Sequence, residues 1–407
     1  MDSPARRRLA LLALALGGFG IGVTEFVTMG LLPNIAADLL PAQYAADPAA
    51  ANAQAGWLVS AYALGVVVGA PTIAAAAARW PRKRLLVGLV SVFVAGNLLS
   101  AVLPSFELVL VARFLSALPH GAYFGIASLV AASLMGPGKR ARGVAFVLGG
   151  LAIANVVGVP IGTHLGQSFG WRSTYLLVTV IFVVTLIAIA IAVPLKPGDP
   201  TATLRNELSA FTRAQVWLTL LLGSIGFAGI FAVYTFVAPV VTDVTGLDEG
   251  FVPWVLVVFG VGMTIGTFVS GWLTDRSVKL SLALGLVGVG LSVLAFALTA
   301  QTVPGLLISI FFIGIFAGAC SPAVQTRLMD VSHNAQSIAA ALNHSALNVG
   351  NSLGAALGGV VIAAGFGYLS PAAVGVALAA LGLVVLTISF TLDRRTSLMP
   401  DSRVVGS

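Results

Sequence analysis

The amino-acid sequence predicts an all-α integral membrane protein with twelve transmembrane helices, arranged as two pseudo-symmetric six-helix bundles. The chain of 407 residues is 58% hydrophobic and only 9% charged, whereas soluble domains carry about 25% charged residues. It contains twelve apolar runs of membrane-spanning length, and its second half repeats features of its first. These three observations exclude an ordinary soluble protein.

Each apolar run is long enough to cross a hydrocarbon core of roughly 30 Å as a helix, at about 1.5 Å per residue. Backbone polar groups find no water in lipid, so a helix is the structure expected for each run. The expected spans are residues 9–33, 55–78, 84–104, 107–134, 142–166, 173–195, 214–241, 252–274, 280–300, 303–326, 336–364 and 370–391.

Several residues recur in order in the two halves. Those of the first half are Trp57, Gly65, Gly69, Arg79 and Arg82, which recur 197 positions later as Trp254, Gly262, Gly266, Arg276 and Lys279. Two halves of the same orientation predict parallel repeats about an axis normal to the membrane. We therefore expect a first bundle over 1–195, a cytoplasmic linker over 196–213 and a second bundle over 214–407, with a short cytoplasmic tail.

The basic residues lie almost entirely at the termini and in the even-numbered connections. The odd-numbered connections hold only one basic residue, Arg172, together with the acidic residues Asp38, Asp47, Asp243, Asp248 and Glu249. By the positive-inside rule, both termini are expected in the cytoplasm. The net charge of +7 is therefore a topology signal, and no nucleic-acid partner is expected. Arg6, Arg7 and Arg8 precede an apolar run that is too long for a signal peptide, so we interpret that run as a retained first helix.

The sequence contains no catalytic constellation. It lacks a phosphate-binding glycine loop followed by Lys-Ser/Thr, and its four histidines and single cysteine do not have the spacing of a metal site. We expect no enzyme activity, no cofactor and no metal. Composition and periodicity alone favour a secondary carrier built from two similar halves.

Glu25 is the one charged residue in the first span. An ionised, unpaired carboxylate costs several kcal/mol in lipid, so such a residue usually has a function. It either loads and releases a proton or meets a cationic ligand, or it is a protonated group bonded to a neighbouring helix. Arg113, in the fourth span, is expected at similar depth and predicts a Glu25–Arg113 ion pair, either static or part of a coupling mechanism.

Other polar and aromatic residues recur at helical spacing within the spans. His120 follows Arg113 by two turns, as a relay, a ligand contact or a packing residue, and Phe124 lies one turn further. Span seven has an aromatic face that includes Phe231 and Tyr234, either for packing or for an amphiphilic ligand. His344, Asn348 and Asn351 form a polar stripe on span eleven, which lines either the contact between the halves or a cavity.

Span five contains Asn155, Gly158, Pro160 and Gly162. Small residues at such spacing allow close helix packing, and a proline bends a span. The same features suit packing alone or a pivot between the halves.

These residues resemble the major facilitator superfamily over essentially the whole chain. Residues 271–279, with Asp275 and Arg276, are similar to its loop signature Gly-x-x-x-Asp-Arg-x-Gly-Arg/Lys-Arg/Lys, with Val278 at the second glycine. The first-half copy is degenerate, with Ala74 and Ala78 in place of the Gly and Asp and with Arg79, Arg82 and Lys83 retained. The resemblance implies that these loops help to lock the cytoplasmic side.

The resemblance extends to one branch of that family. Thr24-Glu25-Phe26 and residues 30–33, 239–243 and 346–350 are similar to the twelve-helix drug:proton antiporter group, and most similar to its arabinose-efflux-permease branch (AraJ and YdhP), which includes chloramphenicol-resistance exporters. Arg113 matches an arginine implicated in proton coupling, and residues 155–166 resemble the antiporter motif of span five, with Val159-Pro160 where Gly-Pro is usual.

The resemblance implies a proton-coupled antiporter in the bacterial inner membrane that exports small hydrophobic or amphiphilic molecules such as drugs, with sugar or nucleoside efflux as the alternative. A monomer is expected, because nothing in the sequence demands an oligomer. The proton-coupling residues are Glu25 and Arg113. The expected substrate contacts are Glu25, Thr28, Met29, His120, Phe124, Phe231, Tyr234, Gln325, His344 and Asn348. The expected gating residues are Arg79, Asn155, Gly158, Pro160, Gly162, Asp275 and Arg276.

Overall fold

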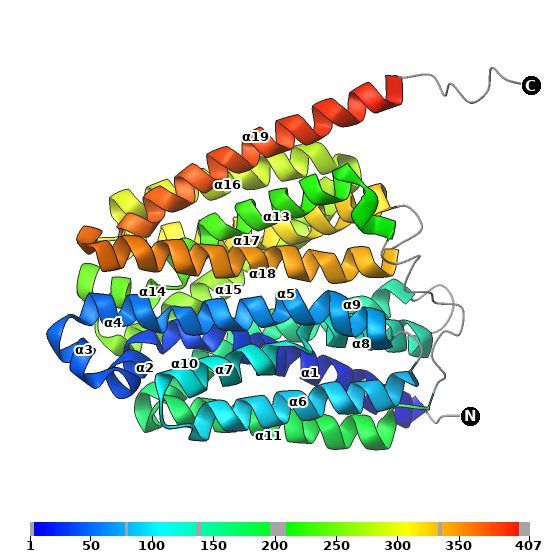
Figure 1. The fold of residues 1–407 in the computed structure, drawn as a ribbon, viewed down its shortest axis with the longest axis horizontal. Helices are drawn as coiled ribbons and strands as arrows, with labels where there is room; N and C mark the ends of the chain where they lie inside the picture. Colours follow the sequence, from blue (N-terminus) through cyan, green and yellow to red (C-terminus); the bar gives the residue numbers. More distant parts are fainter. Residues whose placement is uncertain (1–3, 78–79, 136–139, 196–208, 333–335, 399–407) are drawn as a thin grey trace, which may run out of the picture.

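The computed structural model describes residues 4–77, 80–135, 140–195, 209–332 and 336–398, and this part of the chain is nearly all helical. Within it, twelve helical segments are long and apolar enough to cross a membrane, which confirms the expected fold class. They form two groups, the first half in the lower part of Figure 1 and the second half in the upper part. The expected linker lies mostly outside the described residues.

The membrane-crossing segments of the first half lie close to the expected spans. In chain order they are α1 (Pro4–Gly30), α4 (Pro48–Ala55) continuing into α5 (Trp57–Ala77), α6 (Arg82–Val102), α7 (Phe106–Ala117) continuing into α8 (His120–Met135), α9 (Arg140–Ile153) continuing through η1 (Ala154–Gly158) into α10 (Val159–Phe169), and α11 (Trp171–Ala192).

The second half follows the same order with fewer interruptions. Its membrane-crossing segments are α13 (Ala214–Tyr234), η4 (Glu249–Phe251) continuing into α15 (Val252–Arg276), α16 (Val278–Thr299), α17 (Val303–Ser332), α18 (Gln336–Val361) continuing into η5 (Ile362–Phe366), and α19 (Ser370–Leu398). Shorter segments are α2 (Leu32–Leu39), α3 (Pro41–Ala46), η2 (Ser209–Thr212), α14 (Val237–Pro239) and η3 (Val240–Val244).

Prolines explain the main differences from the expected limits. Span one ends at Gly30 and not near Pro33, because Pro33 lies in the first turn of the separate helix α2, where a missing N–H costs nothing. Span four is divided between Ala117 and His120, where Pro119 cannot donate a backbone hydrogen bond. The apolar pattern of the sequence alone does not predict this break.

The helices α2, α3 and α4 cover one end of the molecule, which we call the cap end (Figure 1). α1 begins and α19 ends at the opposite end, which we call the terminal end. Three hydrogen bonds among the described residues join the halves at the cap end, one of them from Gln167 Nε2 to the Glu249 carbonyl oxygen at 3.0 Å. Asn34 Nδ2 donates to Glu249 Oε1 at 2.7 Å, and Asn52 Nδ2 donates to the Tyr368 hydroxyl at 2.8 Å. The halves are therefore held together by polar contacts at the cap end.

The two halves also pack tightly within the membrane-crossing region. A Cβ on Gly260 of α15 would lie 2.5 Å from the Asn155 carbonyl oxygen of η1, so only glycine allows this approach. Ser60 of α5 donates from Oγ to the Ser352 carbonyl oxygen of α18 at 3.1 Å. Small side chains therefore allow the backbones of the two halves to approach, as is typical of membrane helices.

The cap is attached to the first bundle through Asp38 of α2. Its Oδ2 accepts hydrogen bonds from Trp171 Nε1 at 3.0 Å and from the Arg172 guanidinium at the start of α11. Burial on its own would raise the pKa of the Asp38 carboxyl, but these two hydrogen bonds and the Arg172 charge outweigh burial and hold the pKa below its usual value. Asp38 therefore stabilises the fold in its ionised form.

This pair predicts a pH-dependent stability. Because the folded-state pKa is depressed, the stabilisation is complete at neutral pH and is lost as pH falls through the folded pKa, below about pH 4. Thermal unfolding in detergent should show that the wild type loses stability in acid more steeply than Asp38→Asn. Parallel pH profiles for the two proteins would contradict this assignment.

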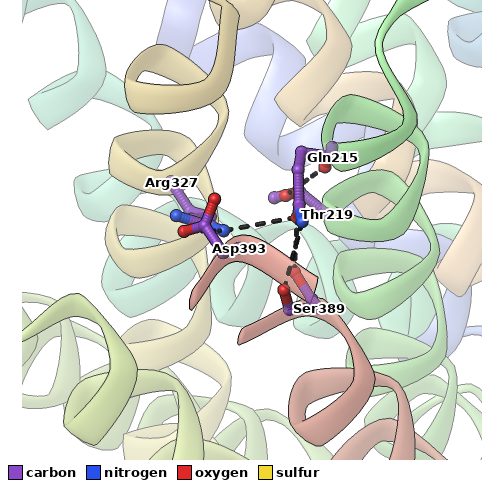
Figure 2. A network of polar contacts seen from close by, with 5 residues as sticks. All are labelled: Gln215, Thr219, Arg327, Ser389 and Asp393. Atoms are coloured by element: carbon purple, nitrogen blue, oxygen red, sulfur yellow. Dashed lines mark hydrogen bonds and ion pairs between the residues drawn. The ribbon is translucent and has the colours of Figure 1, made fainter. Parts of the chain in front are cut away.

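A second polar network lies inside the second bundle and joins α13, α17 and α19 (Figure 2). Arg327 Nη2 donates to Asp393 Oδ2 at 3.0 Å and to Gln215 Oε1 at 3.3 Å, and Ser389 Oγ donates to the same Gln215 oxygen at 2.8 Å. The Arg327 guanidinium carbon also lies 4.5 Å from the ring centroid of Phe390. Three helices are thus joined through one buried arginine.

Removal of this arginine should destabilise the second bundle. We expect Arg327→Met to lower the free energy of unfolding by about 1–3 kcal/mol, because it removes a charged donor to two buried or half-buried acceptors. Asp393→Asn is the matched change, and it should cost less than about 1 kcal/mol because the Asp393 side chain is 43% exposed. Equilibrium unfolding in detergent checks both values, and a larger loss for Asp393→Asn would contradict the stated role of Arg327.

Candidate functional site

Arg113 of α7 is fully buried, at 0% exposure, and its guanidinium is turned toward α1. Nη1 donates to Thr24 Oγ1 at 2.9 Å and Nη2 donates to the Thr24 carbonyl oxygen at 2.8 Å. The guanidinium carbon lies 4.3 Å from the ring centroid of Tyr62 and 5.3 Å from that of Tyr175. Two aromatic faces and two neutral oxygens therefore hold this cation.

The expected Glu25–Arg113 ion pair is absent from the described part of the structure, although the two residues are neighbours. Glu25 follows Thr24 directly, is 7% exposed, and lies within electrostatic range of Arg113. Among the described residues, however, its carboxylate forms no ion pair and accepts no hydrogen bond. Helix geometry explains the difference, because adjacent residues point about 100° apart around a helix. The guanidinium meets Thr24, and Glu25 is left without a partner.

Two further residues fix the position of Thr24 and its neighbours. Thr24 Oγ1 donates to Asn97 Oδ1 of α6 at 2.5 Å, while Asn97 Nδ2 donates to the Phe93 carbonyl oxygen at 2.8 Å. One turn along α1, the hydroxyls of Thr28 and Tyr175 are 2.7 Å apart. Thr28 therefore bonds within the first bundle. The contacts of Thr24, Asn97 and Tyr175 around Arg113 could not be predicted from the sequence.

Tyr62 of α5 connects Arg113 with the second half. Its ring covers the guanidinium, and its hydroxyl lies 3.3 Å from His120 Nδ1. The His120 ring is 5.7 Å from the ring of His344 in α18, and His344 stacks on Phe124 at 5.1 Å. The structure thus brings three of the expected contact residues together across the two halves, and Tyr62 is the link that sequence reasoning missed.

An aromatic cluster lies between α1 and α13. Phe26 stacks on Phe231 with ring centroids 6.2 Å apart and meets Tyr234 edge-on at 6.4 Å. Met29 is fully buried in the same cluster, which contains residues of both halves. Of the expected contacts, Met29, Phe231 and Tyr234 therefore lie in one cluster with Phe26, the residue that directly follows Glu25 in the chain.

The remaining expected contacts lie on α17 and α18. Asn348 Nδ2 donates to the carbonyl oxygen of His344 at 3.0 Å. Gln325 Oε1 accepts from Asn343 Nδ2 at 3.2 Å. Both interactions are within the second half, so Gln325 and Asn348 are not joined by hydrogen bonds to Glu25 or Arg113 in the described structure.

Span five has an unusual local structure. The five residues of η1 form a π-helix just before Pro160, a wide turn that adds one residue to the helix without ending it. Asn155 within it donates from Nδ2 to the Leu151 carbonyl oxygen at 3.0 Å. Added Cβ atoms on Gly158 and Gly162 would contact side chains of α1, at 2.5 and 3.1 Å respectively. The segment therefore combines a local irregularity with close packing on the helix that carries Glu25.

The other expected gating residues lie at the terminal end. Arg79 and the side chain of Asp275 lie outside the described part of the structure. Arg276 is exposed, and its guanidinium carbon lies 3.4 Å from the ring centroid of Trp272. The expected cytoplasmic lock thus remains a prediction.

A pocket of about 260 Å³ lies at the cap end between the halves. Its lining includes Asn34 and Tyr44 from the first half and Asp243 and Glu249 from the second. Burial raises the pKa of the Tyr44 hydroxyl, and the nearby Asp243 and Glu249 carboxylates raise it further. The pocket is therefore negatively charged and is separate from the Glu25 region.

Comparison with known proteins establishes the family. The model of the Major Facilitator Superfamily matches residues 14–252 and 220–404. The chain belongs to this superfamily, which makes it a membrane transporter and not an enzyme.

Similarity to individual proteins indicates the type of transporter. The chain is 38% identical to inner membrane transport protein YdhP of Escherichia coli K12, over 93% of this chain and 95% of that protein. It is 34% identical to a chloramphenicol resistance protein of Streptomyces lividans, over 93% and 95% of the two chains, and 32% identical to the putative transporter AraJ of Escherichia coli K12, over 88% and 89%. The chain is thus a multi-pass inner-membrane transporter of this type.

The solved structures agree on the fold. The crystal structure of a D-xylose-proton symporter superimposes with a TM-score of 0.73 over 92% of this chain and 96% of that one, at 18% identity. This similarity confirms the architecture of two six-helix bundles.

Proposed function

We propose that the protein is a monomeric, proton-coupled antiporter that exports small hydrophobic or amphiphilic molecules, with Glu25 as its proton carrier. The observation that carries this proposal is a lone buried carboxyl without a partner, directly beside a buried guanidinium that bonds only to neutral groups. A carboxyl in this setting is favoured in its neutral form, and it becomes favourable as an anion when a cation approaches.

In this proposal Arg113 alternates between two partners. When Glu25 is protonated, Arg113 rests on Thr24 and between the rings of Tyr62 and Tyr175, as in this structure. When Glu25 loses its proton, its charge attracts Arg113 away from Thr24. Because Tyr62 contacts both Arg113 and His120, this movement would change the contacts between the halves, and so would couple proton release to alternating access.

The orientation of the protein in the membrane is also proposed. The positive-inside rule places the terminal end in the cytoplasm and the cap end outside. The hydrogen bonds from Asn34 and Asn52 to the second half then close the outer side, and their opening would release substrate outward. The π-helix of span five, close to Gly260 of the other half, is the proposed pivot.

Proton flux in liposomes tests this function. The purified protein is reconstituted with a pH-sensitive dye inside, and amphenicols, lipophilic cations, pentoses and nucleosides are added under an imposed proton gradient. Antiport predicts proton movement that depends on one of these classes and is opposite in direction to substrate movement. Proton movement in the same direction as substrate would contradict antiport.

The alternative is efflux of a sugar or nucleoside by the same fold. The polar side chains of Asn155, Gln325, His344 and Asn348 favour it, because hydroxyl-rich substrates need several hydrogen-bonding groups. In the same liposome assay, flux with pentoses or nucleosides and none with amphenicols or lipophilic cations would select this alternative.

A further inference from the structure

The carboxamide of Asn351 in α18 is buried, at 1% exposure, yet neither polar atom has a hydrogen-bond partner among the described residues. The Oδ1 atom of Asn348, one turn earlier on the helix, is likewise buried and accepts no hydrogen bond from the described residues. Buried amides are nearly always hydrogen-bonded, and an unpaired one lowers stability. The unpaired amide atoms therefore lower the stability of the fold, and packing alone does not explain why polar side chains occupy these positions.

The position of Asn351 follows from the contacts of its helix. Gly350 and Gly354 face α13, where added Cβ atoms would lie 2.5 and 2.4 Å from backbone oxygens. Ser352 faces α5, because its carbonyl oxygen accepts the hydrogen bond from Ser60. Asn351 lies between these two faces by helix geometry, so it is directed to the region where the first and second halves meet.

The neighbours of Asn351 on the same face show what surrounds that region. Leu347 and Ala355, one turn to either side, pack in the cluster that contains Phe26 of α1 and Phe231 of α13. Asn351 is thus flanked by residues of a cluster to which aromatic side chains of both halves belong. A molecule with a flat apolar body and one hydrogen-bonding group would complete both features.

We propose that Asn351, assisted by Asn348, is a binding subsite for a neutral hydroxyl or amide group of the transported molecule. The proposal rests on the proposed function, in which the halves enclose substrate in this region. A hydroxyl or amide both donates and accepts hydrogen bonds, as the free Nδ2 and Oδ1 atoms of Asn351 require. The group recognised at this subsite is then an uncharged hydroxyl or amide of an aromatic amphiphile, since Asn351 and Asn348 offer no charge.

Asn351→Leu tests this assignment, because leucine has a similar size and no polar atoms. In the absence of any ligand, Asn351→Leu should be at least as thermally stable as the wild type, since it removes two unpaired buried polar atoms. Asn343→Leu is the matched control on the same helix. Asn343 donates to Gln325 Oε1 and Ser321 Oγ, so this change should lower the unfolding temperature.

Binding in lipid nanodiscs without a proton gradient provides the second measurement. Chloramphenicol, a neutral aromatic molecule with hydroxyl and amide groups, should bind Asn351→Leu about tenfold more weakly than the wild type, the change expected for one lost hydrogen bond. Tetraphenylphosphonium, which has no hydrogen-bonding group, should bind both proteins with the same affinity.

Three results would overturn the proposal. They are a loss of stability in Asn351→Leu comparable to that in Asn343→Leu, an equal loss of affinity for both probes, and failure of chloramphenicol to bind the wild type. These measurements require no transport, so they are independent of proton coupling. If binding behaves as expected and liposomes show no substrate-dependent proton movement, the subsite stands and the antiport proposal fails.

Discussion

Glu25→Gln is expected to lower uphill export by roughly 10²-fold or more, the scale on which a positioned proton-transferring group contributes. Glutamine has the size and hydrogen-bonding capacity of protonated glutamic acid, so the fold and substrate binding should remain. The variant mimics one protonation state permanently, and it should still exchange substrate down a concentration gradient. Export against a gradient, compared with downhill exchange in the same liposomes, measures this difference.

Glu107→Gln is the matched control for this prediction. Glu107 lies in the first turn of α7, the helix that carries Arg113, but its side chain is exposed. Its change should leave uphill export at the wild-type rate. Wild-type uphill export by Glu25→Gln would remove Glu25 from the mechanism.

Arg113→Lys is expected to abolish coupling while retaining the positive charge. A lysine ammonium is a compact point charge without the planar fork, so it cannot reproduce both hydrogen bonds to Thr24 together with the contacts to Tyr62 and Tyr175. We expect export to fall by roughly 10²-fold, as for Glu25→Gln. Arg113→Met, which leaves the Thr24 oxygens without their donor, should in addition cost about 2–4 kcal/mol of unfolding free energy.

Arg84→Lys provides the control for the arginine-to-lysine change, because Arg84 is exposed at the start of α6. It should have wild-type export. A coupled, fully active Arg113→Lys would show that a positive charge at this position is sufficient, and that the paired contacts with Thr24 do not matter.

The number and type of the spans could be predicted because apolar length is a property of local sequence. The helices depart from the expected limits at Pro33 and Pro119. At both positions the helix is interrupted because proline has no backbone N–H to donate. His120, Phe124 and His344, three of the expected substrate contacts, lie together where the halves meet. Their role in substrate binding stays a prediction.

The partners of the charged groups could not be predicted from spacing along the chain. Depth in the membrane placed Glu25 and Arg113 at the same level, but the direction of each side chain around its helix decides which atoms meet. Because of these directions, the Arg113 guanidinium donates its hydrogen bonds to Thr24. Thr24, Asn97 and Tyr62 carry no charge, and nothing in the sequence indicates that they surround Arg113. Only the packing of α1, α5 and α6 reveals these contacts.

In the proposed mechanism, the Glu25 carboxyl releases its proton when substrate binds. The most direct test of this step is the measurement of proton release from purified protein in a weakly buffered solution, with a pH-sensitive dye, as chloramphenicol is added. The proposed mechanism predicts proton release from the wild type and from Glu107→Gln, and none from Glu25→Gln. Equal proton release from Glu25→Gln and the wild type would contradict it.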